Sequence, residues 1–214
     1  MVRSIRAAGA AVLAAAALCG AAAGDEPAGG GKSVPASPLT LAVTGTAKYT
    51  FDPTPLTPES HKKLLEDAAK KGKDFPFGGR LPPVPDVNLK VELKNTSDRP
   101  VTVWVKGDPV ILTLNLAGKG AVNLDPPVAM TQEFRVPQEL KLDAGTSYTF
   151  PVRQLKSGPR GGTHFSYWTG PGEYDLTATL RTGVQPAPKG AEVTDGFGVV
   201  TLTSAPFKLT VAGK

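Results

Sequence analysis

The sequence predicts an all-β protein, an antiparallel β-sandwich with one inserted amphipathic helix. Three phrases carry this prediction: VELKNTSDRP at 91–100, LKLDAGTSYTFPV at 140–152 and GPGEYDLTATLRT at 170–182. In each phrase apolar and polar residues alternate beside a turn, so every second side chain lies on one buried face of a strand. Because no helical pattern separates most of these strands, antiparallel sheets packed face to face are favoured.

The composition is that of an ordinary globular domain. The chain has 214 residues, of which 40% are apolar, and this is enough for a packed core. The 24 glycines and 21 prolines suit an architecture of many short strands and turns. The formal net charge of +5 is too small for the concentrated basic face of a nucleic-acid-binding protein, so no nucleic-acid partner is expected.

Residues 1–23 are predicted to be a secretory signal peptide. Arg3 and Arg6 form the charged start, the apolar run 7–18 follows, and the small residues 21–23 suit cleavage. An apolar run under about 18 residues is short for a membrane-spanning helix. We therefore expect an exported protein, periplasmic, cell-surface or extracellular, with a flexible linker at 24–37 and a single β-sandwich domain at 38–214.

Cys19 is the only cysteine, which excludes a disulfide within the chain. Its position near the end of the apolar run resembles a bacterial lipoprotein cleavage site, where Cys19 would carry the lipid. The alternative is cleavage near Ala23 with Cys19 removed, and the bulky Leu18 before the cysteine favours this alternative. Contact with a membrane is expected only if Cys19 is lipidated.

The first folded elements are two short strands and the helix. Alternating patterns predict strands at Leu39–Val43 and Tyr49–Phe51. A helix is predicted at about 57–72, because Thr57 can cap it, proline follows at the first helical position and Gly72 ends it. Its lysines could be a docking surface for an acidic partner or anionic lipid, or the solvated face of a helix that covers a sheet edge.

From residue 87 onward the strand pattern is nearly continuous. The apolar alternation predicts core faces in three of these strands, and Trp104, which alternates with the valines of its strand, is predicted to be partly buried. Asn95 and Gly145 are predicted to shape turns, and the hydroxyl of Tyr174 to pin a loop. The predicted strands are Val87–Lys94, Val101–Lys106, Val110–Leu116, Glu139–Leu142, Ser147–Val152, Glu173–Arg181, Gly198–Thr203 and Phe207–Val211, with core residues Val91, Leu93, Val101, Val103, Val105, Leu176, Ala178 and Leu180.

The turns carry a family resemblance over about residues 87–182. Asn95-Thr96-Ser97, Leu142-Asp143-Ala144-Gly145-Thr146-Ser147 and Pro171-Gly172-Glu173-Tyr174 resemble the turns of bacterial immunoglobulin-like domains. More distantly, they resemble the bacterial intracellular proteinase inhibitor family. The resemblance implies an immunoglobulin-like sandwich and, through the inhibitor family, inhibition of a protease, but it transfers no inhibitory residue.

Residues with catalytic or metal-binding chemistry are sparse. The chain has two histidines, His61 on the predicted helix and His164 in a later loop, and neither adjoins a nucleophile motif. Cysteine clusters, an HExxH motif and an Asp-rich calcium loop are absent from the sequence. We therefore expect no metal, no cofactor and no enzymatic activity.

The candidate site is the segment SGPRGGTHFSYWTGPG at 157–172. The chain is expected to be a non-enzymatic envelope protein, a protein-interaction or structural module. In this protein the segment would present tyrosine, tryptophan and arginine side chains to a protein partner. The alternatives are a carbohydrate-binding platform, an inhibitor of an extracytoplasmic protease, and a minor core in which the aromatic residues close the end of the sandwich. The predicted partner-binding residues are Arg160, His164, Phe165, Tyr167 and Trp168.

Overall fold

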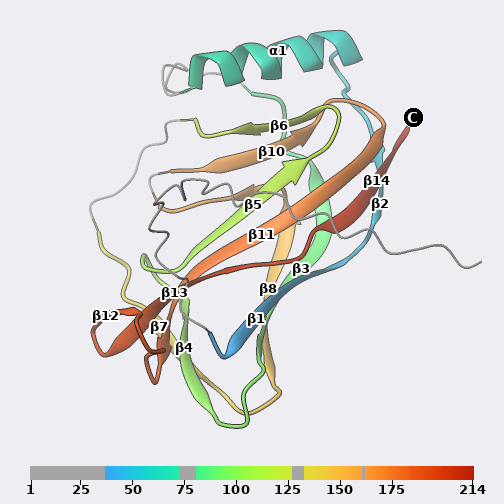
Figure 1. The fold of residues 1–214 in the computed structure, drawn as a ribbon. Helices are drawn as coiled ribbons and strands as arrows, with labels where there is room; N and C mark the ends of the chain where they lie inside the picture. Colours follow the sequence, from blue (N-terminus) through green and yellow to red (C-terminus); the bar gives the residue numbers. More distant parts are fainter. Residues whose placement is uncertain (1–36, 73–80, 127–132, 161) are drawn as a thin grey trace, which may run out of the picture. The chain divides into compact units, whose positions relative to one another are not determined.

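The computed structural model describes residues 37–72, 81–126, 133–160 and 162–214. The predicted signal peptide, Cys19 and the linker up to residue 36 lie outside the described residues. The described residues form one helix and fourteen strands, and the strands belong to three sheets. Figure 1 shows how these elements are arranged. The elements are β1 Leu39–Gly45, β2 Lys48–Phe51, α1 Pro58–Lys71, β3 Asp86–Asn95, β4 Val101–Lys106, β5 Ile111–Ala117, β6 Ala121–Leu124, β7 Gln138–Leu142, β8 Ser147–Gln154, β9 Lys156–Ser157, β10 His164–Trp168, β11 Gly172–Gln185, β12 Glu192–Thr194, β13 Phe197–Thr203 and β14 Phe207–Gly213.

The strands confirm the predicted sandwich with one helix. The smaller main sheet has the order β1-β3-β8, and the larger one is built around the long strand β11. β11 pairs with β14 and β13 along one edge and with β5 and β4 along the other, and β7 extends the sheet from β4. A third sheet, β6-β10-β9, lies under helix α1 (Figure 1).

One strand pair differs from the prediction of antiparallel sheets. β2 runs parallel to β14, the last strand of the chain. Almost the whole domain separates these two strands in the sequence, so no hairpin turn imposes an antiparallel pairing.

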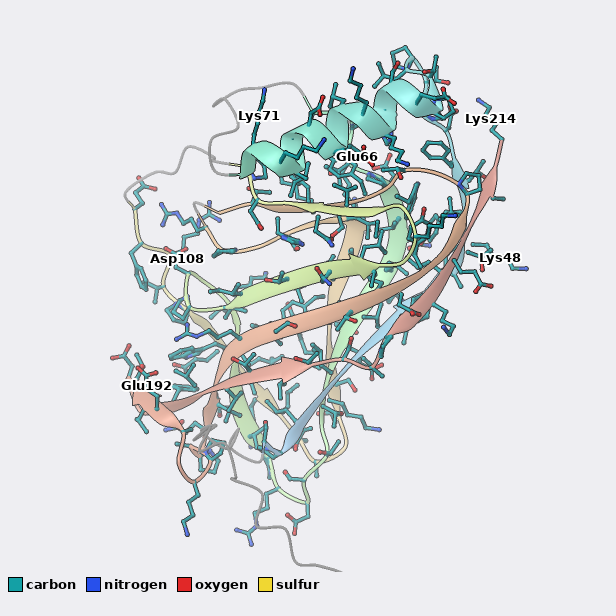
Figure 2. The ribbon with its side chains drawn as sticks, turned by 45° about the horizontal axis from the view of Figure 1, so that its top comes forward. Lys48, Glu66, Lys71, Asp108, Glu192 and Lys214 are labelled. Carbon is teal, nitrogen blue, oxygen red and sulfur yellow. The ribbon has the colours of Figure 1, made fainter. Side chains whose placement is uncertain are left out.

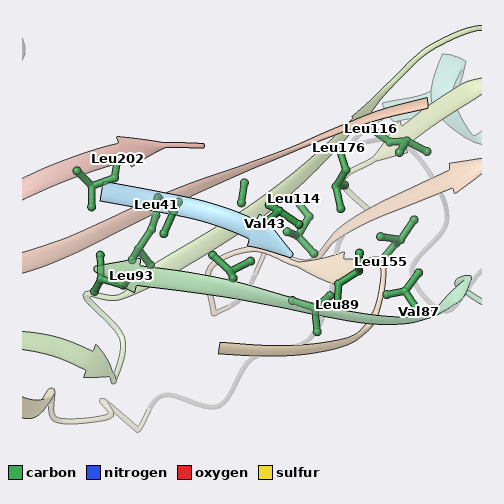
Figure 3. Close-up of a cluster of buried hydrophobic side chains, with 14 of the residues drawn as sticks. Leu41, Val43, Val87, Leu89, Leu93, Leu114, Leu116, Leu155, Leu176 and Leu202 are labelled. Atoms are coloured by element: carbon green, nitrogen blue, oxygen red, sulfur yellow. The ribbon is translucent and has the colours of Figure 1, made fainter. Parts of the chain in front are cut away.

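The core lies between the two main sheets. β3 buries every second residue along most of its length, as the alternation predicted, and all eight predicted core residues are buried. Figure 3 shows leucines and valines of β1, β3, β5 and β11 gathered between the strands. Burial of these apolar side chains supplies most of the driving force for folding.

Trp104 is more deeply buried than predicted. Only 2% of its surface is exposed, and its ring centroid lies 4.7 Å from that of Phe197 at the start of β13. Gly183 of β11 lies against the same ring, where a Cβ would come within 2.5 Å of Cε3. The prediction of partial burial is wrong because Phe197, 93 residues further along the chain than Trp104, covers the second face of β4.

Asn95 is buried and joins the turns of the first two phrases. Its Oδ1 accepts the main-chain N–H of Ser97 at 3.0 Å, which confirms the predicted turn. Its Nδ2 donates to the carbonyl oxygens of Arg99, Leu142 and Asp143 at 2.7, 3.1 and 3.2 Å. One amide side chain therefore organises two loops that are about fifty residues apart.

The other two predicted turn features also hold. Gly145 has a φ of +74°, a conformation that favours glycine. The hydroxyl of Tyr174 donates to the carbonyl oxygen of Gly170 at 2.7 Å and pins the loop before β11.

Helix α1 begins and ends as predicted. Thr57 Oγ1 accepts the main-chain N–H of Ser60 at 3.2 Å, and the N–H of Gly72 bonds to the carbonyl oxygen of Ala68. The buried face is formed by His61, Leu65 and Ala68, whereas Glu66 and Lys71 are exposed (Figure 2). Beside this face, Leu64 is half-buried and Ala69 is exposed.

Candidate functional site

The segment predicted as an exposed aromatic loop contains a strand. β10 pairs with β6 on one side and with β9 on the other. Its opposite faces are both covered, because Tyr167 lies under the helix with Leu65 while Trp168 packs into the main core. The run HFSYW, apolar or aromatic at most positions, is typical of a strand buried on both faces and could have revealed this.

Tyr167 and Trp168 are buried, which corrects the prediction that they bind a partner on an exposed platform and bears out the alternative that they belong to the core. Tyr167 is 0% exposed, its hydroxyl donates to the carbonyl oxygen of Pro82 at 3.1 Å, and burial raises the pKa of Tyr167 above its ordinary value. Trp168 is 5% exposed and stacks on Tyr49 with ring centroids 5.5 Å apart. These rings close the end of the sandwich, so they offer no surface on which a sugar could stack.

Arg160 ties two loops together. Its Nη1 donates to Oδ2 of Asp108 at 2.7 Å, and each of these side chains is 17% exposed. Asp108 lies in the turn between β4 and β5 (Figure 2), and the same Oδ2 accepts the main-chain N–H of Arg135 at 2.9 Å. The hydrogen bond from Arg135, followed by that from Arg160, holds the pKa of Asp108 below its usual value.

His164 and Phe165 are half-buried at the start of β10. Nδ1 of His164 lies 2.8 Å from Oδ1 of Asp125, and its Nε2 is buried without a hydrogen-bond partner among the described residues. Nζ of Lys156 lies 5.7 Å from the centroid of the Phe165 ring, within range of a cation–π contact. Roles of Arg160, His164 and Phe165 in binding a partner stay predictions.

An open groove of about 1160 Å³ lies beside this segment, whose residues 157–159 and 163 contribute to its lining. No pattern in the sequence predicted this groove. Six strands, β3, β4, β5, β7, β8 and β9, contribute to its walls, together with the segments before β7 and after β9. Its apolar floor includes the buried Val105 and Val152 and the half-buried Leu112 and Phe150. The lining residues are Asp86, Val105, Lys106, Gly107, Val110, Leu112, Leu114, Arg135, Val136, Gln138, Phe150, Pro151, Val152, Arg153, Gln154, Lys156, Ser157, Gly158, Pro159 and Thr163.

The rim of the groove is cationic. Lys106, Arg135, Arg153 and Lys156 are exposed and come from four different segments of the chain. The one carboxylate of the lining, Asp86, accepts a hydrogen bond from Nε2 of Gln154 at 3.0 Å. Cations around an apolar floor favour a ligand that carries both negative charge and apolar groups.

The segment 133–137 reaches the groove and exposes apolar side chains. Phe134 is 66% and Val136 is 78% exposed, and these are two of the three large apolar residues exposed in the described ranges. The main chain is held at Arg135, whose carbonyl oxygen accepts the N–H of Asp108 at 2.9 Å. Gly107 allows the close approach, because a Cβ there would lie 2.8 Å from the carbonyl oxygen of Val136.

Within the part of the chain that the structure describes, no group of three or more His, Cys, Asp or Glu side chains could hold a metal ion. Among these same residues, none of the helical segments is long and apolar enough to span a bilayer.

Comparison with known proteins found no match. The chain matched no protein-family model, no curated protein and no solved structure. The immunoglobulin-like resemblance and the link to proteinase inhibitors therefore remain proposals.

Proposed function

We propose that this chain is a non-enzymatic, exported module of the bacterial envelope that binds another protein through the cationic groove and the adjoining segment 133–137. The observation that carries this proposal is the groove of about 1160 Å³, whose lining includes both the apolar floor and Val136. Phe134 and Val136 are strongly exposed there. Exposed apolar residues beside a hollow mark interaction surfaces more often than apolar residues scattered singly.

A protein partner accounts for this surface better than a sugar does. Phe134 and Arg135 are side chains of the kinds that contribute most to protein interfaces, and they stand next to each other on the segment. Asp108 bonds to both the N–H and the carbonyl oxygen of Arg135, so the main chain at this residue is already ordered before a partner binds. The sugar platform predicted from Tyr167 and Trp168 is not formed, because both of these side chains are buried.

Site-specific cross-linking tests the proposal. A photo-reactive residue placed at Phe134 is expected to trap one protein from the envelope of cells that make the full chain. The same residue at Thr201, which is exposed on β13 and does not line the groove, is the control. A cross-linked species at both positions or at neither would contradict the proposal.

Export is tested by the mature N-terminus. A chain that begins near residue 24 is expected after cleavage of the signal peptide, whereas a lipid-modified Cys19 as the first residue would indicate a membrane-anchored form. A mature chain that retains Met1 in the cytoplasm would refute the proposed localisation.

A second candidate function, inhibition of an extracytoplasmic protease, is favoured by one observation. Residues 133–136 are exposed, and Asp108 holds the main chain of Arg135: its Oδ2 accepts the N–H of Arg135, and its N–H donates to the carbonyl oxygen of Arg135. A segment that resists cleavage in a protease cleft must likewise be held in one conformation. An inhibitor of this kind would present Arg135 to a protease that cleaves after basic residues. The absence of inhibition at micromolar protein, with wild type and Arg135→Ala behaving alike, would eliminate this candidate.

A further inference from the structure

We propose that the groove binds an extended, acidic segment of the partner protein, one in which carboxylate side chains alternate with apolar ones. This inference rests on the proposed function and names the chemistry of its partner.

The groove has the shape for an extended chain. The five consecutive residues 150–154 of β8 line it, and at a rise of about 3.3 Å per residue they span about 13 Å. β8 is an outer strand of its sheet, so no further strand of the described chain lies on its free edge. Lining residues of β4 and β5 come from the other main sheet. The walls therefore accept a few residues of peptide lying along β8.

The free edge of β8 does not favour continuous strand pairing. Pro151 lies in the middle of this strand and has no N–H to donate to a partner. Prolines at such positions protect sheet edges from indiscriminate pairing. We therefore assign recognition to the side chains of the bound segment, its apolar residues reaching Leu112 and Phe150 and its carboxylates remaining at the rim.

The charges of the rim select an acidic segment. Lys106, Arg153 and Lys156 form no ion pair with any other residue that the structure describes. Asp86, the lone carboxylate in the lining, is already engaged by Gln154. The rim thus has more positive charge than its own acidic residue can neutralise, and a basic segment would be repelled.

The distribution of these cations favours a peptide over a small anionic lipid. A fatty acid has a single charged group and would need its cations gathered at one end of an apolar pocket. Here the cations come from β4, the segment before β7, β8 and β9, around an open groove. A chain with several carboxylates can meet several of them at once.

Fluorescence anisotropy with labelled peptides tests the inference on the mature protein. Three matched peptides of about ten residues alternate valine or leucine with aspartate, asparagine or lysine. Two double variants with the same change in net charge are compared: Lys106→Glu with Arg153→Glu at the rim, and Lys48→Glu with Lys189→Glu, which are exposed and lie outside the groove. Circular dichroism verifies that both variants fold.

The aspartate peptide is expected to bind most tightly, to lose at least tenfold in affinity with the rim variant, and to change less than twofold with the control variant. Its binding should also weaken as salt is added. Equal binding of the three peptides, or equal losses in the two double variants, would overturn the inference. If the aspartate peptide binds neither wild type nor the rim variant, and a fatty acid binds wild type but not the rim variant, the ligand is a lipid and the peptide is refuted. If Phe134 still cross-links a protein when all peptides fail, the acidic segment is refuted and the proposed function stands.

Discussion

Asn95→Ala is expected to cost this protein about 3 kcal/mol of stability, although the residue does not line the groove. Asn95 is 0% exposed, and its side chain makes hydrogen bonds to the main chain of four other residues. Alanine removes both the donor and the acceptor while the rest of the strand remains unchanged.

The magnitude follows from the burial of each partner. The bond to the carbonyl oxygen of Leu142 is buried, and an unsatisfied buried group costs about 1–3 kcal/mol. The bonds to Arg99, Asp143 and Ser97 are partly buried, so water can replace them and each loss costs less, about 0.5 kcal/mol. Together these losses amount to roughly 3 kcal/mol, which lowers the Tm of a chain of this size by about 6–12 °C.

Urea unfolding of the mature chain measures the effect. Asn88→Ala is the matched control, because Asn88 lies on the same strand, is exposed, and uses its main-chain N–H rather than its side chain to bond with Tyr49. The control is expected to change stability by less than about 0.5 kcal/mol. A loss below about 1 kcal/mol for Asn95→Ala would refute the reasoning, because water or a shifted loop would then satisfy the carbonyl oxygens that the amide now binds.

Three further predictions follow from the packing. Burial lowers the pKa of His61, so the unfolded state binds a proton more readily than the folded state does. The stability that depends on neutral His61 should be complete above about pH 6.5 and fall as the pH drops below it. In urea unfolding from pH 8 to 5, the loss of stability with falling pH should be smaller in His61→Leu than in wild type, and an equal loss in both proteins would contradict this. Gly183→Ala should destabilise by about 1–3 kcal/mol in urea, because its Cβ would overlap the Trp104 ring, whereas Gly170→Ala, with open space around its Cβ, should change stability little; equal effects would show that the ring moves aside. Tyr174→Phe should cost about 1 kcal/mol through the lost hydrogen bond to Gly170, and an unchanged thermal midpoint would mean that this hydroxyl pins nothing.

Much of the fold could be predicted because local patterns decide it. The strand Val101–Lys106 has its predicted bounds, and the helix has the predicted Thr57 cap and Gly72 end. These features depend on alternation, capping and turn chemistry within a few residues, which the sequence displays directly. The short strands β6, β9 and β12 escaped prediction because two to four residues establish a period only weakly; β2, of similar length, was predicted because its aromatic residues Tyr49 and Phe51 alternate.

The candidate site could not be predicted in the same way. The residues of the groove come from segments between Asp86 and Thr163 that are individually unremarkable in sequence, and their gathering depends on how the two sheets pack. Arg135 shows the difficulty: nothing in its local sequence indicates that Asp108, 27 residues earlier, would hold its main chain.

The sequence by itself determined where most of the longer strands lie, where the helix begins and ends, and which side chains of those strands share a face, because these properties follow from neighbours along the chain. The tertiary structure alone decided whether a face meets solvent or a second layer. Tyr167, Trp168 and Trp104 have aromatic side chains that suit either environment, and they are buried because helix α1, Tyr49 and Phe197 cover them. Exposure is set by contacts between segments distant in sequence. For this reason the proposed binding site is the groove and not the aromatic loop predicted from the sequence.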